Sequence, residues 1–592
     1  MQKLNLEKWS KDPELEGLLF FAQAVYDMLF DYTLDSYKVP ALNTHSRCLE
    51  GLVFTDMVSR GLIPQKYQKS LDPIIAEFLW SFKNDQIIKG LFGKKKEYYV
   101  REVESRKDKS KELKNILNLI ADLLSLNYLE EVKKQLRTAI CEEPNKKDLI
   151  YSLTCSFLPE LIYSGYSKGF IFYKTKSFFF DPGIPPEINS PEQLDEFLNE
   201  FDLEEKEFNL IFKANEDFKY IIEPPPEAPK PRTSRGYEKD FFEERSEDYP
   251  FIIEFKGIKA FDAHSARGIA EDRIRVWASL LKYKIHTRDF SWQNKVLIYE
   301  PHDHPLVMDP PTKAVHKKPD IKLDEFLKET KKILELFEGN LDEESVAIIM
   351  GALKLHSEAI SAKTEENQLL TFWSSIEGIL TPPGDVGRIN YILRSIKPLL
   401  VFDYPKKLIF DIQKNLEKLG GPEVMEIIDK VEGDNLFEKC AAIISIKENE
   451  TFRDEIYSLL QDKGDVLMKN RLYKLMQKLK SAENIKSTIE EHRQRVVWHV
   501  QRIYRMRNMI AHSMVRLPPY YLDTLIENLH AYVDRILELL LTTSKDNPNI
   551  ETIEGIILKI SLDVDTHLNI LKTHKEEYCK PENYMLYLLG PK

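Results

Sequence analysis

The stretch IEEHRQRVVWHVQRIYRMRNMIAHSM, residues 489–514, decides most of what the sequence says about the fold. Apolar residues recur in it at helical spacing, and at 100° per residue they form one stripe. The members of this stripe are Val496, Val500, Ile503, Ile510 and Met514. Arg507 falls in the middle of the stripe, where another aliphatic side chain is expected. A buried guanidinium is costly unless it is paired, so we expect an acid from another helix, for instance Glu377, to compensate it.

The segment RNMIAH, residues 507–512, combines a permanently charged guanidinium, a polar amide and an imidazole that titrates near neutrality. The imidazole can move the proton of a ribose 2′-hydroxyl, and the guanidinium can hold the scissile phosphate and the charge that builds on it. On a uniform helix Arg507 and His512 lie roughly 140° apart around the axis and ~7.5 Å apart along it. A working site therefore needs either a loosened helix at this point or a second copy that faces it.

The surroundings of this segment are basic. Residues 471–507 contain ten Lys or Arg residues and three acids. Aromatic and imidazole side chains are interleaved with these cations, namely His492, Trp498, His499 and Tyr504. Clustered cations attract phosphates, and aromatic faces stack on unpaired bases, so the pattern predicts an RNA-binding surface. The cations that we expect to bind RNA are Arg493, Arg495, Arg502 and Arg505. A solvated basic helix face is the alternative.

The length and composition indicate a multidomain globular protein. The chain has 592 residues, of which 43% are hydrophobic and 30% charged. Its net charge of −12 argues against a protein that coats nucleic acid, although it permits a local basic site. The five cysteines contain no C-x-x-C pair, which suggests neither a disulfide framework nor a zinc knuckle. Without a signal peptide or a long apolar window, we expect a cytoplasmic protein that does not contact a membrane.

The fold predicted from these patterns is mainly α with a smaller α/β part. Residues 1–222 form a mostly helical domain of regulatory or unknown role, with a strand expected at 165–181. Residues 223–250, with six prolines and mixed charge, form a linker. Residues 251–321 form a small α/β domain, and residues 322–592 form a helical bundle.

The small α/β domain is expected to contain a β-α-β unit. Residues 251–261 are typical of a strand, residues 262–285 of a helix and residues 295–301 of a second strand. Asp262 or Ser265 is available to cap the helix.

Two separated motifs resemble a known family. The string IYRMRNMIAH, residues 503–512, is similar to the Arg-x4-His signature of HEPN domains, specifically of their ApeA-like branch. The upstream segment NQLLTFWSSIEGIL, residues 367–380, resembles the opening helix of that branch and includes its acidic Glu377. The helix around residues 352–359 fits as well, and the resemblance covers roughly residues 335–545. A long span precedes the motif helix and suggests inserted helices at 388–480.

The resemblance implies an all-helical domain that pairs about a two-fold axis, so that two Arg-x4-His motifs form one composite ribonuclease site. Arg507 would bind and polarise the phosphate, and His512 would act as general acid and base. Asn508 would orient both of them, while Glu377, as a tether of Arg507, and Tyr504 would support the site.

We therefore expect a metal-independent endoribonuclease without a cofactor that acts in anti-phage defence by abortive infection, or as a toxin. Its partners would be RNA, with tRNA as one candidate, a second copy of the chain, and a phage-derived or protein trigger. Attack by the 2′-oxygen would leave 2′,3′-cyclic phosphate ends. One alternative is a non-catalytic HEPN-like scaffold. The other is a metal-dependent nuclease centred on Glu254 and Lys256, whose Glu-x-Lys pattern lies on an expected strand.

Overall fold

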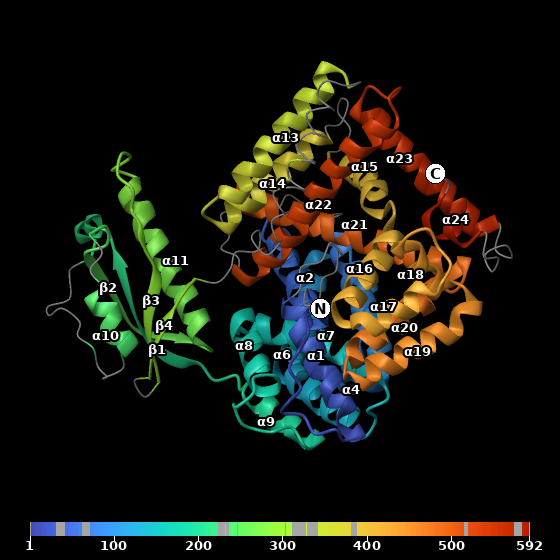
Figure 1. Cartoon of the computed structure of the whole chain (residues 1–592). Helices are drawn as coiled ribbons and strands as arrows, with labels where there is room; N and C mark the ends of the chain where they lie inside the picture. Colours follow the sequence, from blue (N-terminus) through green and yellow to red (C-terminus); the bar gives the residue numbers. More distant parts are fainter. Residues whose placement is uncertain are drawn as a thin grey trace. The chain divides into compact units, whose positions relative to one another are not determined.

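The computed structural model describes residues 2–30, 42–61, 71–222, 231, 236–244, 247–301, 304–310, 327, 341–380, 388–513, 519–573 and 583–590. The chain is mainly helical and contains one small antiparallel sheet, which confirms the predicted fold class (Figure 1). It divides into two compact units. The helical unit comprises Met1–Pro159, Phe180–Glu192 and Ala314–Lys592, and the α/β unit comprises Glu160–Phe179 and Gln193–Lys313.

The helical unit is built from two groups of helices that are far apart in sequence. The first group is α1 (Glu16–Phe30), α2 (Thr44–Ser59), α3 (Asp72–Asn84), α4 (Gln86–Phe92), α5 (Lys96–Arg106), α6 (Ser110–Cys141) and α7 (Lys147–Ser164). The second group is α13 (Glu343–Ser361), α14 (Glu365–Ile379), α15 (Arg388–Val401), α16 (Tyr404–Leu419), α17 (Gly421–Asp429), α18 (Leu436–Ser445), α19 (Glu450–Asp462), α20 (Val466–Leu479), α21 (Ala482–Ser513), α22 (Pro519–Asp546), α23 (Ile553–Thr573) and α24 (Tyr584–Leu589).

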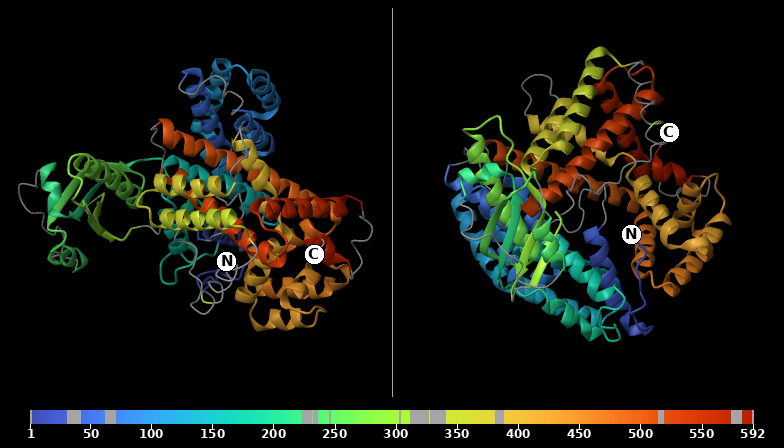
Figure 2. Two further views of the ribbon diagram at one scale, coloured as in Figure 1. Left: turned by 90° about the horizontal axis from the view of Figure 1, so that it is seen from above. Right: turned by 60° about the vertical axis from the view of Figure 1, so that its left-hand side comes forward.

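One apolar core joins these two groups. Phe54 of α2 and Ile74 of α3 belong to the same cluster as Trp373 of α14, Ile503 of α21 and Ile536 of α22. In both views of Figure 2, α13 and α14 run side by side over this part of the bundle. The predicted boundaries are therefore wrong: residues 1–222 are not a separate domain, because their first helices share a core with the last ones.

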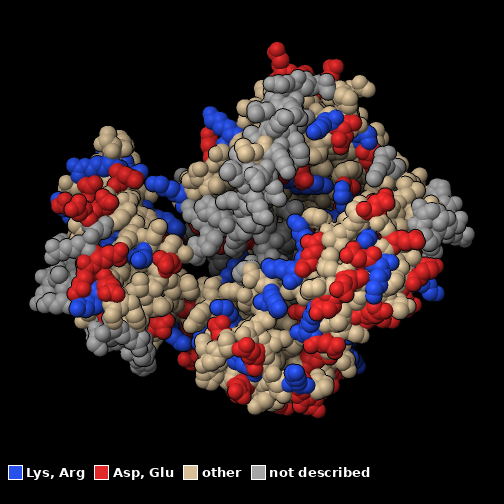
Figure 3. Space-filling view, in the orientation of Figure 1, with Lys and Arg blue, Asp and Glu red and all other residues tan. Residues whose placement is uncertain are grey.

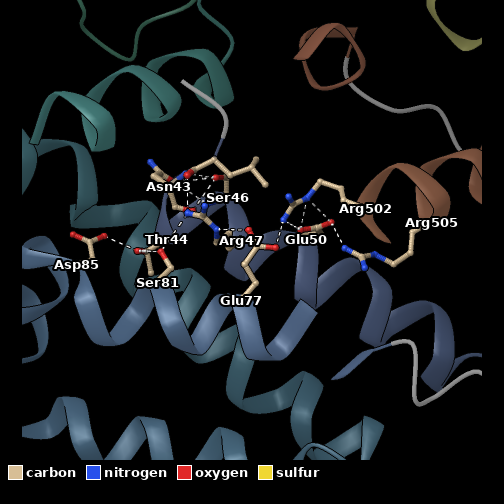
Figure 4. A network of polar contacts seen from close by, with 11 residues as sticks. Asn43, Thr44, Ser46, Arg47, Glu50, Glu77, Ser81, Asp85, Arg502 and Arg505 are labelled. Carbon is tan, nitrogen blue, oxygen red and sulfur yellow. Dashed lines mark hydrogen bonds and ion pairs between the residues drawn. The ribbon is translucent and has the colours of Figure 1, made fainter. Parts of the chain in front are cut away.

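Buried ion pairs add a second connection between the two groups (Figure 4). Arg502 of α21 donates to both carboxylate oxygens of Glu50 and, at 2.6 Å, to Glu77. Arg505 donates to Glu50 at 3.1 Å, and Arg47 of α2 donates to Glu77 at 2.9 Å. All five side chains are at most 7% exposed. Because these side chains have little contact with water, each charge is stabilised mainly by the opposite charges beside it. The network therefore holds α21 in one register against α2 and α3.

A third connection reaches the inserted helices predicted at 388–480, which are α15 to α20. The amide of Gln23 in α1 donates to the carbonyl of Gly464 at 2.8 Å and accepts from the N–H of Leu467 at 3.0 Å. Asp27, one turn further along α1, pairs with Arg471 of α20. The N-terminal helix therefore caps the start of α20 and anchors the insertion.

The α/β unit contains α8 (Lys168–Phe179), α9 (Leu194–Asn199), β1 (Lys206–Ala214), α10 (Gly236–Glu243), β2 (Phe251–Ala260), α11 (Ala263–Lys282), β3 (Trp292–Glu300) and β4 (His304–Met308). The strand order is β2-β1-β3-β4, with antiparallel neighbours throughout. The predicted strands and helix of the β-α-β unit are present as β2, α11 and β3, and Asp262 caps α11 by accepting from the N–H of Ser265. Sequence reasoning missed β1, which separates the two predicted strands.

Part of the predicted linker at 223–250 is folded. Its helix α10 places Phe241 against the sheet residues Ile211 and Leu297, and Tyr299 donates a hydrogen bond to Glu238 at 2.5 Å. The α/β unit thus starts before the proline-rich segment and includes this part of it.

The prediction of a strand at residues 165–181 is also wrong, because residues 168–179 form the helix α8. The buried side chains Ile171, Thr175 and Phe179 are four residues apart, which is helical spacing, whereas Tyr173 between them is 58% exposed. The many aromatic residues of this segment are typical of a strand, and they led to the strand prediction despite the helical spacing.

If the buried network holds α21 in place, Arg502→Ala should lower the free energy of unfolding by about 3–5 kcal/mol, because it leaves two buried carboxylates short of a partner. Arg493→Ala, on a half-buried arginine of the same helix, should change it by less than about 0.5 kcal/mol. Urea unfolding of both variants measures the difference. A cost below about 1 kcal/mol for Arg502→Ala would show that the network does not hold the helix.

Candidate active site at the end of α21

The C-terminal turns of α21 place Arg507 beside α14. Its Nη2 lies 3.4 Å from Oε2 of Glu377, and its Nη1 donates to Oδ1 of Asn508 at 3.0 Å. The Glu377 side chain is 8% exposed, whereas that of Arg507 keeps 25% exposure. The predicted pairing with Glu377 is confirmed. A guanidinium has five N–H donors and these two contacts engage two of them, so Arg507 is an oriented and partly exposed cation with further donors.

Tyr504 forms a second contact between the same two helices. Its ring lies 5.6 Å from that of Trp373, which is completely buried in α14. Trp373 and Glu377 are four residues apart, and Tyr504 and Arg507 are three apart, so each pair shares one helix face. The contact between Tyr504 and Trp373 therefore holds α21 and α14 at the separation at which Arg507 reaches Glu377.

His512 belongs to the last turn of α21, and its side chain lies outside the described part of the structure. The helix is continuous from Ala482 to Ser513. The loosening that would bring the two motif residues together within one chain is therefore absent over these residues. Their separation remains that of a regular helix, roughly 140° around the axis and ~7.5 Å along it.

For two of the four arginines predicted to bind RNA, the structure contradicts the prediction. Arg502 and Arg505 are buried and ion-paired with Glu50 and, for Arg502, Glu77, so they cannot reach a polynucleotide in this fold. The signal for this was present in the sequence, since Glu50 and Glu77 interrupt apolar helices and buried acids need a cation. Arg493 and Arg495 are half-buried and remain candidates.

The aromatic groups of the basic stretch are also structural, contrary to expectation. Trp498 is 8% exposed and packs 5.4 Å from Trp80, and His492 stacks on Tyr404 at 3.6 Å. His499 is bonded to the hydroxyl of Tyr532 at 3.0 Å. These rings offer no free face to a base. Among the described residues on the face shown in Figure 3, acidic and basic side chains are interspersed.

The alternative site at Glu254 and Lys256 lies on β2, an edge strand. The two side chains pair with each other at 3.4 Å, and Lys256 is 73% exposed. A metal-dependent nuclease needs further carboxylates close to the first. Within the described residues Glu254 joins no group of three metal-ligating side chains, so the geometry favours an ordinary surface pair.

A small cavity elsewhere in the helical unit does not compete as an active site. It is lined by Asp403, Lys406, Asp563 and His567 among others, and its volume is about 150 Å³. Sites for drug-sized ligands enclose about 300–1,000 Å³, so this cavity is too small for a nucleotide.

No protein-family model, curated protein or solved structure matches the chain. In the described ranges, no helix has the length and apolar composition needed to cross a membrane.

Burial of His499 predicts a pH dependence of stability. Burial, with a smaller contribution from the nearby Arg502 cation, lowers the pKa of this imidazole to about 3, although Glu77 and Glu50 oppose the change. Below the unfolded-state value of about 6.5, the unfolded chain binds a proton that the folded chain does not. The stabilising contribution of neutral His499 is thus complete above pH 6.5 and is lost progressively as the pH falls toward 3.

His499→Gln, which retains a hydrogen-bonding group for Tyr532, should flatten this dependence by up to about 1.4 kcal/mol per pH unit between pH 6 and 4. Urea unfolding at several pH values, with the parent chain as reference, measures the two slopes. Identical slopes would mean that His499 is not kept neutral by the fold.

Proposed function

We propose that this chain is a metal-independent endoribonuclease of the HEPN type that acts as an anti-phage or toxin effector. The observation that carries the proposal is the state of Arg507. Unlike the buried Arg502 and Arg505, it is oriented by Glu377 and Asn508 and retains partial exposure on the helix whose last turn contains His512. A fixed guanidinium at a solvent-facing position is suited to bind a phosphate and to stabilise charge that develops on it.

The unbroken helix supports a site shared between two copies. On a regular helix the positions of Arg507 and His512 lie on different faces, which favours a site to which two chains contribute. Two chains related by a two-fold axis can present Arg507 of one copy and His512 of the other at a common point. Of the two arrangements open from the sequence, the continuous helix supports paired copies.

In this site the imidazole of His512 accepts the proton of the ribose 2′-hydroxyl as the 2′-oxygen attacks the adjacent phosphorus. The bond to the 5′-oxygen breaks, and that oxygen takes up a proton from water. Arg507 compensates the negative charge on the phosphorane oxygens. The expected products are a 2′,3′-cyclic phosphate and a 5′-hydroxyl.

RNA, with tRNA as one candidate, would approach along the outer side of α21. Lys397 of α15 supports this route, because burial and the charge of Arg493 both lower its pKa, which places two cations close together on neighbouring helices. Two cations close together are a suitable contact for a phosphate backbone.

Complementation between variants tests both the chemistry and the pairing. Arg507→Ala and His512→Ala should each abolish RNA cleavage in excess EDTA, because each removes one half of every pair. When the two variants are co-expressed and purified together, mixed dimers contain one intact pair in trans. About half of the dimers are mixed and each keeps one of two pairs, so activity should return to roughly a quarter of the parent level.

The controls separate the possible failures. Circular dichroism must show that both variants keep the parent's helical content, and each variant mixed with itself must stay inactive. Unchanged cleavage by His512→Ala would refute the ribonuclease assignment. Inactive mixtures would refute the shared site, and a dimeric parent that cleaves no RNA even with a phage lysate added would favour the scaffold.

A further inference from the structure

A cluster of three metal-ligating side chains lies in the helical unit, on helices other than α21. His356 comes from α13, and His530 and Asp534 come from α22; one ligand atom of each lies within 4.8 Å of the others. Nε2 of His356 is 2.9 Å from Oδ1 of Asp534, and Nε2 of His530 is 3.5 Å from Oδ2. One carboxylate thus faces two imidazole nitrogens from different helices.

The local sequence explains this convergence. His530 and Asp534 are four residues apart on α22 and therefore share one face of the helix. Phe372 of α14, which is fully buried, stacks on His530 at 5.0 Å and meets the edge of His356 at 5.5 Å. Both imidazoles therefore pack against one rigid aromatic ring, which limits their rotation and keeps their nitrogens directed at Asp534.

The donor set identifies the class of ion. Two imidazoles and one carboxylate suit Zn²⁺, Co²⁺, Ni²⁺ and Fe²⁺, whereas Ca²⁺ and Mg²⁺ prefer oxygen ligands alone. With metal–ligand bonds of about 2.0–2.1 Å, the donors of a tetrahedral site lie about 3.3 Å apart. Nε2 of His356 lies 2.9 Å from one carboxylate oxygen of Asp534 and Nε2 of His530 lies 3.5 Å from the other, so both distances are close to this value.

The exposed fractions of the three side chains suit a metal site that an ion can enter from solvent. The side chain of His530 is 5% exposed, while those of His356 and Asp534 are each 19% exposed. An ion could therefore reach the cluster from solvent, and water could take a remaining coordination position, as in three-ligand zinc sites.

We propose that His356, His530 and Asp534 bind one divalent transition-metal ion that fastens α13 to α22. The site is separate from the Arg507 motif, and nothing in the proposed RNA chemistry passes through it. Bound to the folded state, the ion stabilises the bundle that positions α14, and with it Glu377.

Metal binding to the full-length chain tests this directly. We would strip the protein with chelator, remove the chelator, and titrate it with Co²⁺ alone, following visible absorption, with Zn²⁺ as competitor. A Cys141→Ser background removes an exposed thiol that could bind either ion. The parent should bind one equivalent, and Zn²⁺ should raise its melting temperature.

Asp534→Asn and His356→Gln should each weaken Co²⁺ binding by at least about tenfold and abolish the Zn²⁺-dependent rise in melting temperature. His286→Gln, which changes an exposed histidine of the α/β unit, should bind as the parent does. A parent that binds no ion would overturn the proposal, as would equal binding by Asp534→Asn, and the cluster would then be a hydrogen-bonded packing group. The readout involves no RNA, so its failure leaves the proposed ribonuclease untouched.

Discussion

The buried ion pairs between Arg502, Glu50 and Glu77 are the constraint on which the helical unit depends. They connect α21 to two helices more than 400 residues earlier in the chain, at distances of 2.6 to 3.1 Å. Charges removed from water in this way allow little freedom of register, because a displaced partner leaves an unpaired ion in the core. The N-terminal helices thus act as part of the scaffold that holds the motif helix.

This constraint determines what each arginine of α21 can do. Arg502 and Arg505 face α2 and α3 and are used for structure, whereas Arg507 faces α14 and keeps partial exposure. A rotation of the helix that freed Arg502 would break the network and also separate Arg507 from Glu377. Stability and the candidate catalytic geometry therefore depend on the same helix orientation.

Periodicity within one segment was enough to predict the helix over residues 489–513, and local residue types offered Asp262 or Ser265 as the cap of α11. The pairing of Arg507 with Glu377 followed from the cost of an unpaired buried guanidinium and not from spacing. The errors came from partners that are distant in sequence. The basic stretch was interpreted as a solvent-facing surface because Glu50 and Glu77 lie in what was expected to be another domain. Similarly, β1 was missed because its neighbours β2 and β3 lie on the far side of the proline-rich segment. Nothing in local spacing indicates which distant helix neutralises a charge.

The chemistry of the RNA ends tests the central claim most directly. RNA incubated with the purified chain in excess EDTA should be cut, and mass spectrometry of the fragments should find 2′,3′-cyclic phosphates and 5′-hydroxyls, as attack by the 2′-oxygen requires. Fragments with 5′-phosphates and 3′-hydroxyls, formed only when a divalent metal ion is added, would contradict the account.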